Sequence, residues 1–319
     1  MTEVSAEAIR AAVERVPAAF RAMPQFVSEP LRAALGRPVV VMAESANPIG
    51  CFKGRGTWLA VEALAAAGEV GERSGLVAAS AGNFGQGVAY AARAHRVPFV
   101  VFAARNANAA KVAAMRRLGA EVRLAGEDFD AAREAAAEYA ARSGWRLIID
   151  GQDPHIAIGA GTMAVELTDA VERGDLPSLD ALYVPVGNGA LIAGVGTWLK
   201  AAAPATRVIG VQATGAPAMT YSWREGRAIE TPTVETVADG IAARVPVAEA
   251  LAIMRRCVDD MVLVDDDAIV AAQRELTAAL PFTVEPSAAA AWAAMRNAPA
   301  GAGAIGFILT GGNLPPPRD

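Results

Sequence analysis

The sequence predicts an α/β protein whose parallel sheets are covered by helices on both faces. Short apolar runs rich in valine, leucine and isoleucine alternate with longer segments of helical period along most of the chain. Strands that alternate with helices in this way form parallel sheets. Glycine-rich turns follow expected strands at residues 50–56, 80–87, 187–190 and 310–313. Because such folds bind ligands at the carboxyl ends of their strands, these turns are the expected functional site.

The first expected element is an amphipathic helix over residues 6–23, with Ile9, Val13, Val16 and Phe20 on one face. Expected strands cover residues 38–42, 76–79, 99–102, 122–124, 147–149, 181–186, 207–212, 261–264 and 305–309. Expected helices cover residues 57–67, 88–94, 107–118, 128–142, 161–173, 191–202, 247–256, 266–279 and 287–297, with two short segments between 213 and 245. Glycine ends several of these helices because it adopts the left-handed conformation that closes a helix.

Composition and charge exclude several classes of protein. The chain has 319 residues, 53% hydrophobic and 20% charged, which suits one large or two ordinary domains with a sizeable core. No apolar run reaches the roughly 18–20 residues of a membrane span, and the N-terminus has no apolar signal core. The net charge of −5 and the lack of a basic tract argue against nucleic acid as a partner.

The cysteine and histidine content argues against disulfides and metal centres. Cys51 and Cys257 are the only cysteines, so no disulfide framework is expected and the cytoplasm is the expected compartment. The only histidines, His95 and His155, are too few and too far apart in sequence for a His/Cys metal site. Neither histidine neighbours a nucleophile elbow, so a catalytic triad is not expected.

Lys53 is the candidate catalytic residue because of its place in the first glycine-rich turn. Lysine is the common side chain that forms a Schiff base with an aldehyde, and a sheltered site makes it reactive. The 29 basic residues include only three lysines. Lys111 is expected on a polar helix face and Lys200 at a helix end, so both look like solvated surface residues. On this stretch alone, an exposed turn lysine without a chemical role is the alternative for Lys53.

The turn at residues 187–190 (Gly-Asn-Gly-Ala) follows a strand and opens a helix, where backbone N–H groups suit a phosphate. A dinucleotide fingerprint fails because Ile192 replaces its third glycine and Gln212 ends the next strand in place of an acid. A Walker loop is absent as well. The turn therefore favours a single phosphate monoester, and a tight turn without a ligand is the alternative.

The other two turns offer polar groups for an amino acid and for a heterocyclic ring. Ser80, Asn83 and Gln86, at an expected helix start, suit a small carboxylate, and an N-capped helix is the alternative. Thr310 ends the last strand, where its hydroxyl suits a neutral ring nitrogen or forms a simple cap. Glu285 precedes a proline and could simply cap the next helix. Together the turns supply a Schiff-base lysine, a phosphate cup, a carboxylate cradle and a ring-nitrogen partner, which pyridoxal phosphate and an amino acid need.

In this order the motifs resemble those of the fold type II pyridoxal-phosphate enzymes, most closely the serine/threonine dehydratases. Residues 47–56 resemble the family's Schiff-base lysine motif, residues 80–89 its substrate-carboxylate loop and residues 187–191 its phosphate loop. Further matches lie at residues 159–162, 238–240 and 285–287. The resemblance spans nearly the whole chain.

The resemblance implies a tryptophan synthase β-subunit-like fold with two doubly wound parallel-sheet domains. Residues 1–65 and 154–319 would form a large cofactor domain, and residues 66–153 a small mobile domain. It also implies pyridoxal 5'-phosphate as cofactor, Lys53 as catalytic residue and a homodimer. The implied cofactor-binding residues are Phe52, Lys53, Asn83, Gly187, Asn188, Gly189, Ala190, Leu191, Gly240, Glu285 and Thr310. The implied substrate-binding residues are Ser80, Ala81, Gly82, Asn83 and Gln86.

Several positions depart from the family pattern and bear on the substrate. Cys51 stands where serine is usual, and Phe84 stands where histidine is common. Asn188 and Ala190 replace two glycines of the phosphate loop. This loop variant and Thr310 are also similar to the threonine synthases.

Two further departures concern racemisation and metal binding. The resembling serine racemases use a second serine in the carboxylate loop as the opposite-face base, and Ala81 occupies that position here. They also bind a divalent cation through acidic residues, and the matching positions here are Gln212 and Ala218. Neither racemase activity nor a metal site is therefore expected.

The predicted function is a pyridoxal-phosphate-dependent β-elimination. A β-hydroxy amino acid such as L-threonine or L-serine would be dehydrated and deaminated to a 2-oxo acid and ammonia. A threonine synthase-like β- or γ-replacement enzyme is the alternative within the family, and a non-catalytic pyridoxal-phosphate-binding protein is the alternative of another class. The expected partner is a small amino-acid substrate, without nucleic acid or a membrane.

Overall fold

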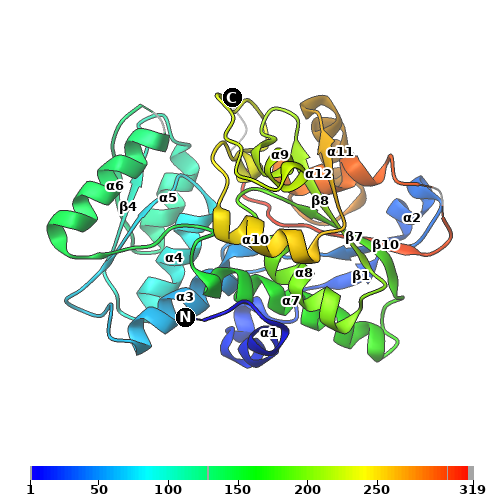
Figure 1. Ribbon diagram of the computed structural model, residues 1–319, viewed down its shortest axis with the longest axis horizontal. Coiled ribbons are helices and arrows are strands. Elements are labelled where there is room, and N and C mark those ends of the chain that lie inside the picture. Colours follow the sequence, from blue (N-terminus) through cyan, green and yellow to red (C-terminus); the bar gives the residue numbers. More distant parts are fainter. Residues whose placement is uncertain (1, 128, 300, 315–319) are drawn as a thin grey trace.

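Two sheets built mainly from parallel strands carry the fold (Figure 1). The computed structural model describes residues 2–127, 129–299 and 301–314. The larger sheet has the order β1-β2-β10-β7-β8-β9, with β1 at Gln25–Val27, β2 at Val39–Met42, β7 at Leu179–Pro185, β8 at Arg207–Ala213, β9 at Asp260–Val264 and β10 at Ala304–Ile308. The smaller sheet has the order β5-β4-β3-β6, with β3 at Leu76–Ala79, β4 at Phe99–Ala103, β5 at Glu121–Leu124 and β6 at Arg146–Leu147.

Helices surround both sheets, with α4, α5 and α6 around the smaller one and most of the others around the larger one (Figure 1). Their bounds are α1 Ala6–Ala12, α2 Glu29–Leu35, α3 Lys53–Ala66, α4 Asn83–Ala94, α5 Ala109–Arg117, α6 Phe129–Ser143, α7 Pro154–Glu172, α8 Ala190–Ala202, α9 Ala218–Glu225, α10 Ala248–Cys257, α11 Asp266–Ala279 and α12 Pro286–Met295. Short 3-10 turns are η1 Val13–Arg15, η2 Ala18–Phe20 and η3 Asp239–Ile241. Among the described helices, none is long and apolar enough to cross a membrane.

The two faces of the larger sheet bury different side chains of the same strand. On β2, Val40 and Met42 pack into the core that contains α7 and α8. Val39 and Val41 pack into the core that contains α12. This alternation is the two-residue period of a strand, and all four side chains are fully buried. An uninterrupted apolar run therefore marks a strand that is covered on both faces.

Glycines bring the backbones of α3, α7 and α8 into close contact. A Cβ on Gly194 of α8 would lie 1.9 Å from the carbonyl oxygen of Ala157 in α7. A Cβ on Gly159 of α7 would lie 2.5 Å from the Cα of Gly56 in α3. Because no side chain fits at these contacts, the glycines fix the position of α3, the helix that begins at Lys53.

Helices α3, α4 and α7 begin earlier than the sequence predicts. The prediction placed the motif glycines in turns, but Gly54, Gly56 and Gly85 lie inside helices. Close packing explains these glycines, because a Cβ on Gly85 would lie 2.4 Å from the Met115 sulfur. Residue 128, where the sequence predicts that another helix begins, lies outside the described residues.

The N-terminal segment differs most from the prediction. The expected helix over residues 6–23 ends at Ala12 and continues as 3-10 turns, since Pro17 lacks the N–H that an α-helix needs. Neither β1 nor α2 was predicted. Strand β1 runs antiparallel to β2, with Phe26 opposite Val41, so one edge of the larger sheet is not parallel.

The smaller sheet lies within residues 66–153, the range predicted for the small domain. The boundaries of that domain and its mobility stay predictions. The chain leaves the smaller sheet through residues 148–153, which connect β6 to α7. This connection passes beside the start of α8, because a Cβ on Gly151 would lie 3.0 Å from the Asn188 side chain.

Arg55 is a buried arginine that joins α3 to α7 and to the segment after β2. Its guanidinium donates to both oxygens of Glu44 at 2.8 Å. It also donates to both oxygens of Glu166, at 2.8 and 2.9 Å, and to Thr162 Oγ1 at 3.1 Å. Burial alone lowers the pKa of Arg55, but the two carboxylates raise it overall, so the arginine stays charged.

We expect Arg55→Ala to lower the free energy of unfolding by about 3–5 kcal/mol, because it leaves the buried Glu44 carboxylate unpaired. The control Arg105→Ala removes a solvent-exposed pair with Glu127 and should cost less than about 1 kcal/mol. Urea unfolding followed by circular dichroism measures both losses. Equal losses in the two variants would contradict this role of Arg55.

Candidate active site

The lysine turn and the last turn of the sequence meet because β2 and β10 are parallel neighbours. Ile308 pairs with Met42 at the carboxyl ends of the two strands. Beyond the strands, the Phe52 N–H donates to the Thr310 carbonyl oxygen at 3.0 Å, and Cys51 forms an antiparallel bridge with Gly311. The structure thus places the residues of these two motifs side by side.

Lys53 is shielded from solvent at the start of α3. Its side chain is 12% exposed, and Nζ donates to Asp150 Oδ2 at 2.5 Å. The same nitrogen lies 4.9 Å from the ring centre of Phe52 and 5.9 Å from that of Phe84. The alternative of an exposed turn lysine is therefore wrong, whereas the catalytic role of Lys53 stays a prediction.

The candidate carboxylate loop, residues 80–87, leads from β3 into α4. The Ser80 hydroxyl accepts hydrogen bonds from the N–H groups of Gly82 and Gly85, at 3.2 and 3.0 Å, and so fixes the turn. Gln86 is 4% exposed, and its Nε2 is buried without a hydrogen-bond partner in the described part of the chain. The loop therefore presents a helix N-terminus and an unused buried donor, which suits a carboxylate.

Glu285 joins this loop to the C-terminal end of the larger sheet. Asn83 Nδ2 donates to both Glu285 oxygens, at 3.2 and 3.0 Å, and the Asn313 N–H donates to Oε1 at 2.9 Å. Asn313 Nδ2 in turn donates to Asn83 Oδ1 at 2.9 Å. Glu285 is the N-cap residue of α12, but its side chain makes no cap hydrogen bond, so side-chain capping does not account for this carboxylate. Burial is the main reason that the pKa of Glu285 is raised.

The candidate phosphate turn precedes α8, with Gly189 in the left-handed conformation at φ 94°. A Cβ on Gly189 would lie 2.8 Å from the Met254 sulfur, and a Cβ on Gly187 would lie 3.0 Å from the Gly240 carbonyl oxygen. The latter contact brings two of the predicted cofactor-binding segments together. The N–H groups of a first helical turn have no partner within the helix, so this turn suits one phosphate.

Lys111 lies near the candidate carboxylate loop, and its prediction as a solvated surface residue was wrong. It is 7% exposed and forms an ion pair with Asp239 of η3. Its Nζ lies 3.9 Å from the position that a Cβ on Gly82 would take. The polar helix face suggested solvent, but the segment around Asp239 covers it.

Asp150 is a site residue that the sequence analysis missed. Its Oδ2 contacts Lys53, and its Oδ1 is buried without a hydrogen-bond partner among the described residues. A signal was present, because Asp150 directly follows the expected strand at 147–149, and strand ends form the ligand-binding edge of such folds.

The arrangement fits pyridoxal phosphate with an amino acid bound to it. It offers a shielded lysine amine, a helix start without side chains at Gly187 and Gly189, and a buried Thr310 at a strand end. Buried polar atoms are normally satisfied in folded proteins. Gln86 Nε2 and Asp150 Oδ1 are therefore available to a ligand.

Residues 19–311 match the family model "Pyridoxal-phosphate dependent enzyme". The chain belongs to this family. Within it, an L-threonine ammonia-lyase of Thermotoga maritima is 35% identical over 288 residues, which cover 90% of this chain and 70% of the relative. The predicted family and the pyridoxal-phosphate dependence are thereby confirmed.

Solved structures of the pyridoxal-phosphate enzymes confirm the predicted fold class. The processed form of threonine deaminase isoform 2 from Solanum lycopersicum superposes with a TM-score of 0.88 at 32% identity, covering 97% of this chain and 83% of that chain. Maize serine racemase superposes with a TM-score of 0.90 at 29% identity, covering 98% of this chain and 94% of that chain.

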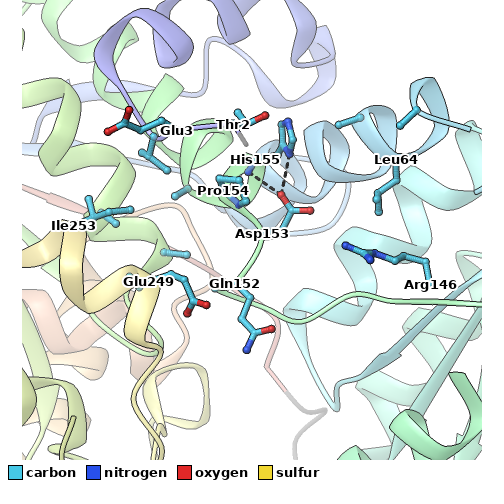
Figure 2. A pocket seen from close by; sticks show the side chains of 18 of the residues that line it. Thr2, Glu3, Leu64, Arg146, Gln152, Asp153, Pro154, His155, Glu249 and Ile253 are labelled. Carbon is cyan, nitrogen blue, oxygen red and sulfur yellow. Dashed lines mark hydrogen bonds and ion pairs between the residues drawn. The ribbon is translucent and has the colours of Figure 1, made fainter. Parts of the chain in front are cut away.

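A cavity of about 800 Å³ lies beside the start of α8 rather than at Lys53 (Figure 2). Its lining comes from the N-terminal segment, the end of α3, the start of α7 and α10, and includes Ala190. Figure 2 shows His155 and Asp153 joined by hydrogen bonds, of which that from the ring measures 2.9 Å. Since neither Lys53 nor Asn83 lines this cavity, we do not assign it to the chemistry.

The predicted lack of a metal site stays a prediction. Gln212 Oε1 accepts hydrogen bonds from the N–H and the hydroxyl of Thr220, both at 2.8 Å. Ala218 is fully buried. Over the described residues, no group of three or more histidine, cysteine or acidic side chains is placed to hold a cation.

We expect neither cysteine to react with Ellman's reagent at pH 8 in the folded protein. Both thiols are buried; burial raises the pKa of Cys51 and raises that of Cys257 to about 12. A raised pKa keeps the thiol protonated at pH 8, whereas the thiolate is the reacting form. Two thiols should titrate after denaturation in guanidinium chloride. Rapid reaction of one thiol under native conditions would contradict the burial of one of the two cysteines.

Proposed function

We propose that this chain is a pyridoxal-phosphate-dependent ammonia-lyase that acts on a β-hydroxy amino acid. Its substrates would be L-threonine or L-serine, and its products a 2-oxo acid and ammonia. The observation that carries this proposal is the shielded amine of Lys53 beside Phe84 in the first turn of α4, where a helix N-terminus and the unpaired Nε2 of Gln86 suit a substrate carboxylate. The similarity to the Thermotoga maritima ammonia-lyase supports it.

The residues present can hold the cofactor at four points. Lys53 would hold it covalently, the first-turn N–H groups of residues 187–191 its phosphate, Thr310 its ring nitrogen and Asn83 its ring hydroxyl. When bound, pyridoxal phosphate withdraws electrons from the substrate Cα and so makes the Cα proton acidic.

The chain's own groups then carry out the elimination. The N-terminus of α4 and Gln86 hold the substrate carboxylate. The Lys53 amine takes the Cα proton, and Asp150 stabilises the resulting ammonium through the contact that the two side chains already make. The Cβ–O bond breaks, and the leaving oxygen takes up the proton that Lys53 had accepted, so that water leaves. The unsaturated amino acid then reacts with water to give a 2-oxo acid and ammonia. Phe52 and Phe84 keep water away from the Lys53 nitrogen.

The alternatives differ in measurable products. A replacement enzyme would need a second substrate and would release no keto acid from threonine alone. A non-catalytic binding protein would hold the cofactor without turnover. We further propose a homodimer, a mobile small domain over residues 66–153 and a cytoplasmic location; two free buried cysteines agree with a reducing compartment.

We expect Lys53→Ala to abolish turnover while the fold survives, with a loss of about 1–3 kcal/mol in the free energy of unfolding because Asp150 loses its ion-pair partner. The control Lys200→Ala removes an ion pair with Asp259 outside the site and should keep full activity. Keto-acid release from L-threonine measures turnover, and urea unfolding measures stability. A Lys53→Ala variant that keeps a tenth of the wild-type rate would refute the catalytic assignment.

We expect elimination without racemisation, because Ala81 has a methyl group where an opposite-face acid would be needed. Such an acid must stand within roughly 2.6–3.2 Å of the proton acceptor or act through one water. The neighbouring Ser80 hydroxyl is held by the N–H groups of Gly82 and Gly85. Incubation of L-serine in D₂O followed by chiral analysis decides the point.

Formation of D-serine at a rate comparable to that of pyruvate would contradict the role given to Ala81. The matched variant Ala81→Ser should create this side reaction, because it adds a hydroxyl on the loop.

A further inference from the structure

Only one of the two Asp150 carboxylate oxygens contacts Lys53, and the other has no hydrogen-bond partner among the described residues. Its Oδ2 accepts from Lys53 Nζ at 2.5 Å, whereas its Oδ1 is buried and has no partner in the part of the chain that the structure describes. A buried acceptor without a hydrogen bond costs free energy. The Asp150 side chain as a whole is 23% exposed, so the carboxylate lies at the edge of the site.

Lys53 fixes the distance between Asp150 and the substrate. To take the Cα proton, Nζ must come within roughly 3–3.5 Å of the substrate Cα. Because Asp150 Oδ2 lies 2.5 Å from the same nitrogen, the carboxylate is within about 6 Å of Cα. The substituent on Cβ therefore lies in the field of Asp150.

The other charged groups near the site, Lys111 and Glu285, already have partners within the chain. Lys111 is paired with Asp239. Glu285 accepts from Asn83 and from Asn313, and burial raises its pKa. While Lys53 is the uncharged amine that accepts the Cα proton, it offers Asp150 no ammonium. Asp150 is then a negative charge that faces the substrate without its own counter-charge.

We propose that Asp150 determines substrate specificity by charge. The site accepts a Cβ substituent that is a neutral hydrogen-bond donor or a cation, and it rejects a substrate whose side chain is anionic. The inference rests on the proposed function and deepens it. A like charge at about 6 Å, with an effective dielectric constant of about 20, costs roughly 100-fold in binding. Partial exposure of Asp150 reduces this, so we expect at least tenfold.

Three substrate classes follow from this charge rule. The hydroxyl of threonine or serine donates a hydrogen bond to Oδ1. The ammonium of a 2,3-diamino acid pairs with it; there Lys53 takes the Cα proton, and the Cβ–N bond breaks with its electron pair leaving on ammonia. The side-chain carboxylate of a 3-hydroxyaspartate, or the phosphate of a phosphorylated hydroxy amino acid, is repelled.

The test compares the holoenzyme with its Asp150→Asn variant on three substrates. The ratio of kcat/KM for L-threo-3-hydroxyaspartate to that for L-threonine should rise at least tenfold in the variant. The ratio for L-2,3-diaminopropionate to L-threonine should fall at least tenfold. The control is Asp153→Asn, which lies in the same connection between β6 and α7 and keeps a side chain that can cap α7. It should leave both ratios within twofold. Equal losses on all three substrates in Asp150→Asn would overturn the proposal and leave Asp150 as a partner of Lys53 alone.

A binding measurement separates this inference from the proposed function. L-alanine and L-aspartate lack a β-leaving group, and their binding changes the absorption of the bound cofactor. The wild-type protein should bind L-aspartate at least tenfold more weakly than L-alanine, and Asp150→Asn should close most of that gap. A gap that persists in the variant refutes the charge rule. A lack of turnover with every amino acid refutes the ammonia-lyase assignment, whereas the two binding constants still decide the role of Asp150.

Discussion

The site depends on the position of one buried cation, Arg55. It follows Lys53 by two residues in the first turn of α3 and holds Glu44 and Glu166 at once. If the start of α3 moved, Glu44 and Glu166 would each lose their ion pair with Arg55, and an unpaired buried charge costs several kcal/mol of stability. The close contact between Gly159 of α7 and Gly56 of α3 also fixes the position of α3. The lysine turn therefore has a single position at the carboxyl end of β2.

The substrate side of the site is held in a different way, by hydrogen bonds that cross from one sheet to the other. Asn83 belongs to the helix that follows β3, whereas Glu285 precedes α12 and Asn313 follows β10 of the larger sheet. Lys111 and Asp239 form a second such link. One half of the site is thus fixed by close packing and the Arg55 ion pairs, and the other half by hydrogen bonds and an ion pair between the two sheets.

The sequence predicts the alternating elements well because buried parallel strands are continuous apolar runs, as in β2 and β10. It also predicts the four motifs by their place after strands, three after strands of the larger sheet and one after β3 of the smaller sheet. It fails where burial depends on a distant segment: the helix face of Lys111 reads as polar, but the segment around Asp239 covers it. The antiparallel β1 is short and carries no alternation, so no local pattern indicates it.

Strand β10 lies between β2 and β7, although it is the last described strand along the chain. Until residues 304–308 leave the ribosome, β2 and β7 therefore expose unpaired backbone edges that invite wrong partners. At about 5–20 residues per second, those edges stay open for seconds. The larger sheet can close only after nearly all of the described chain has been synthesised, so its completion is a late event in folding.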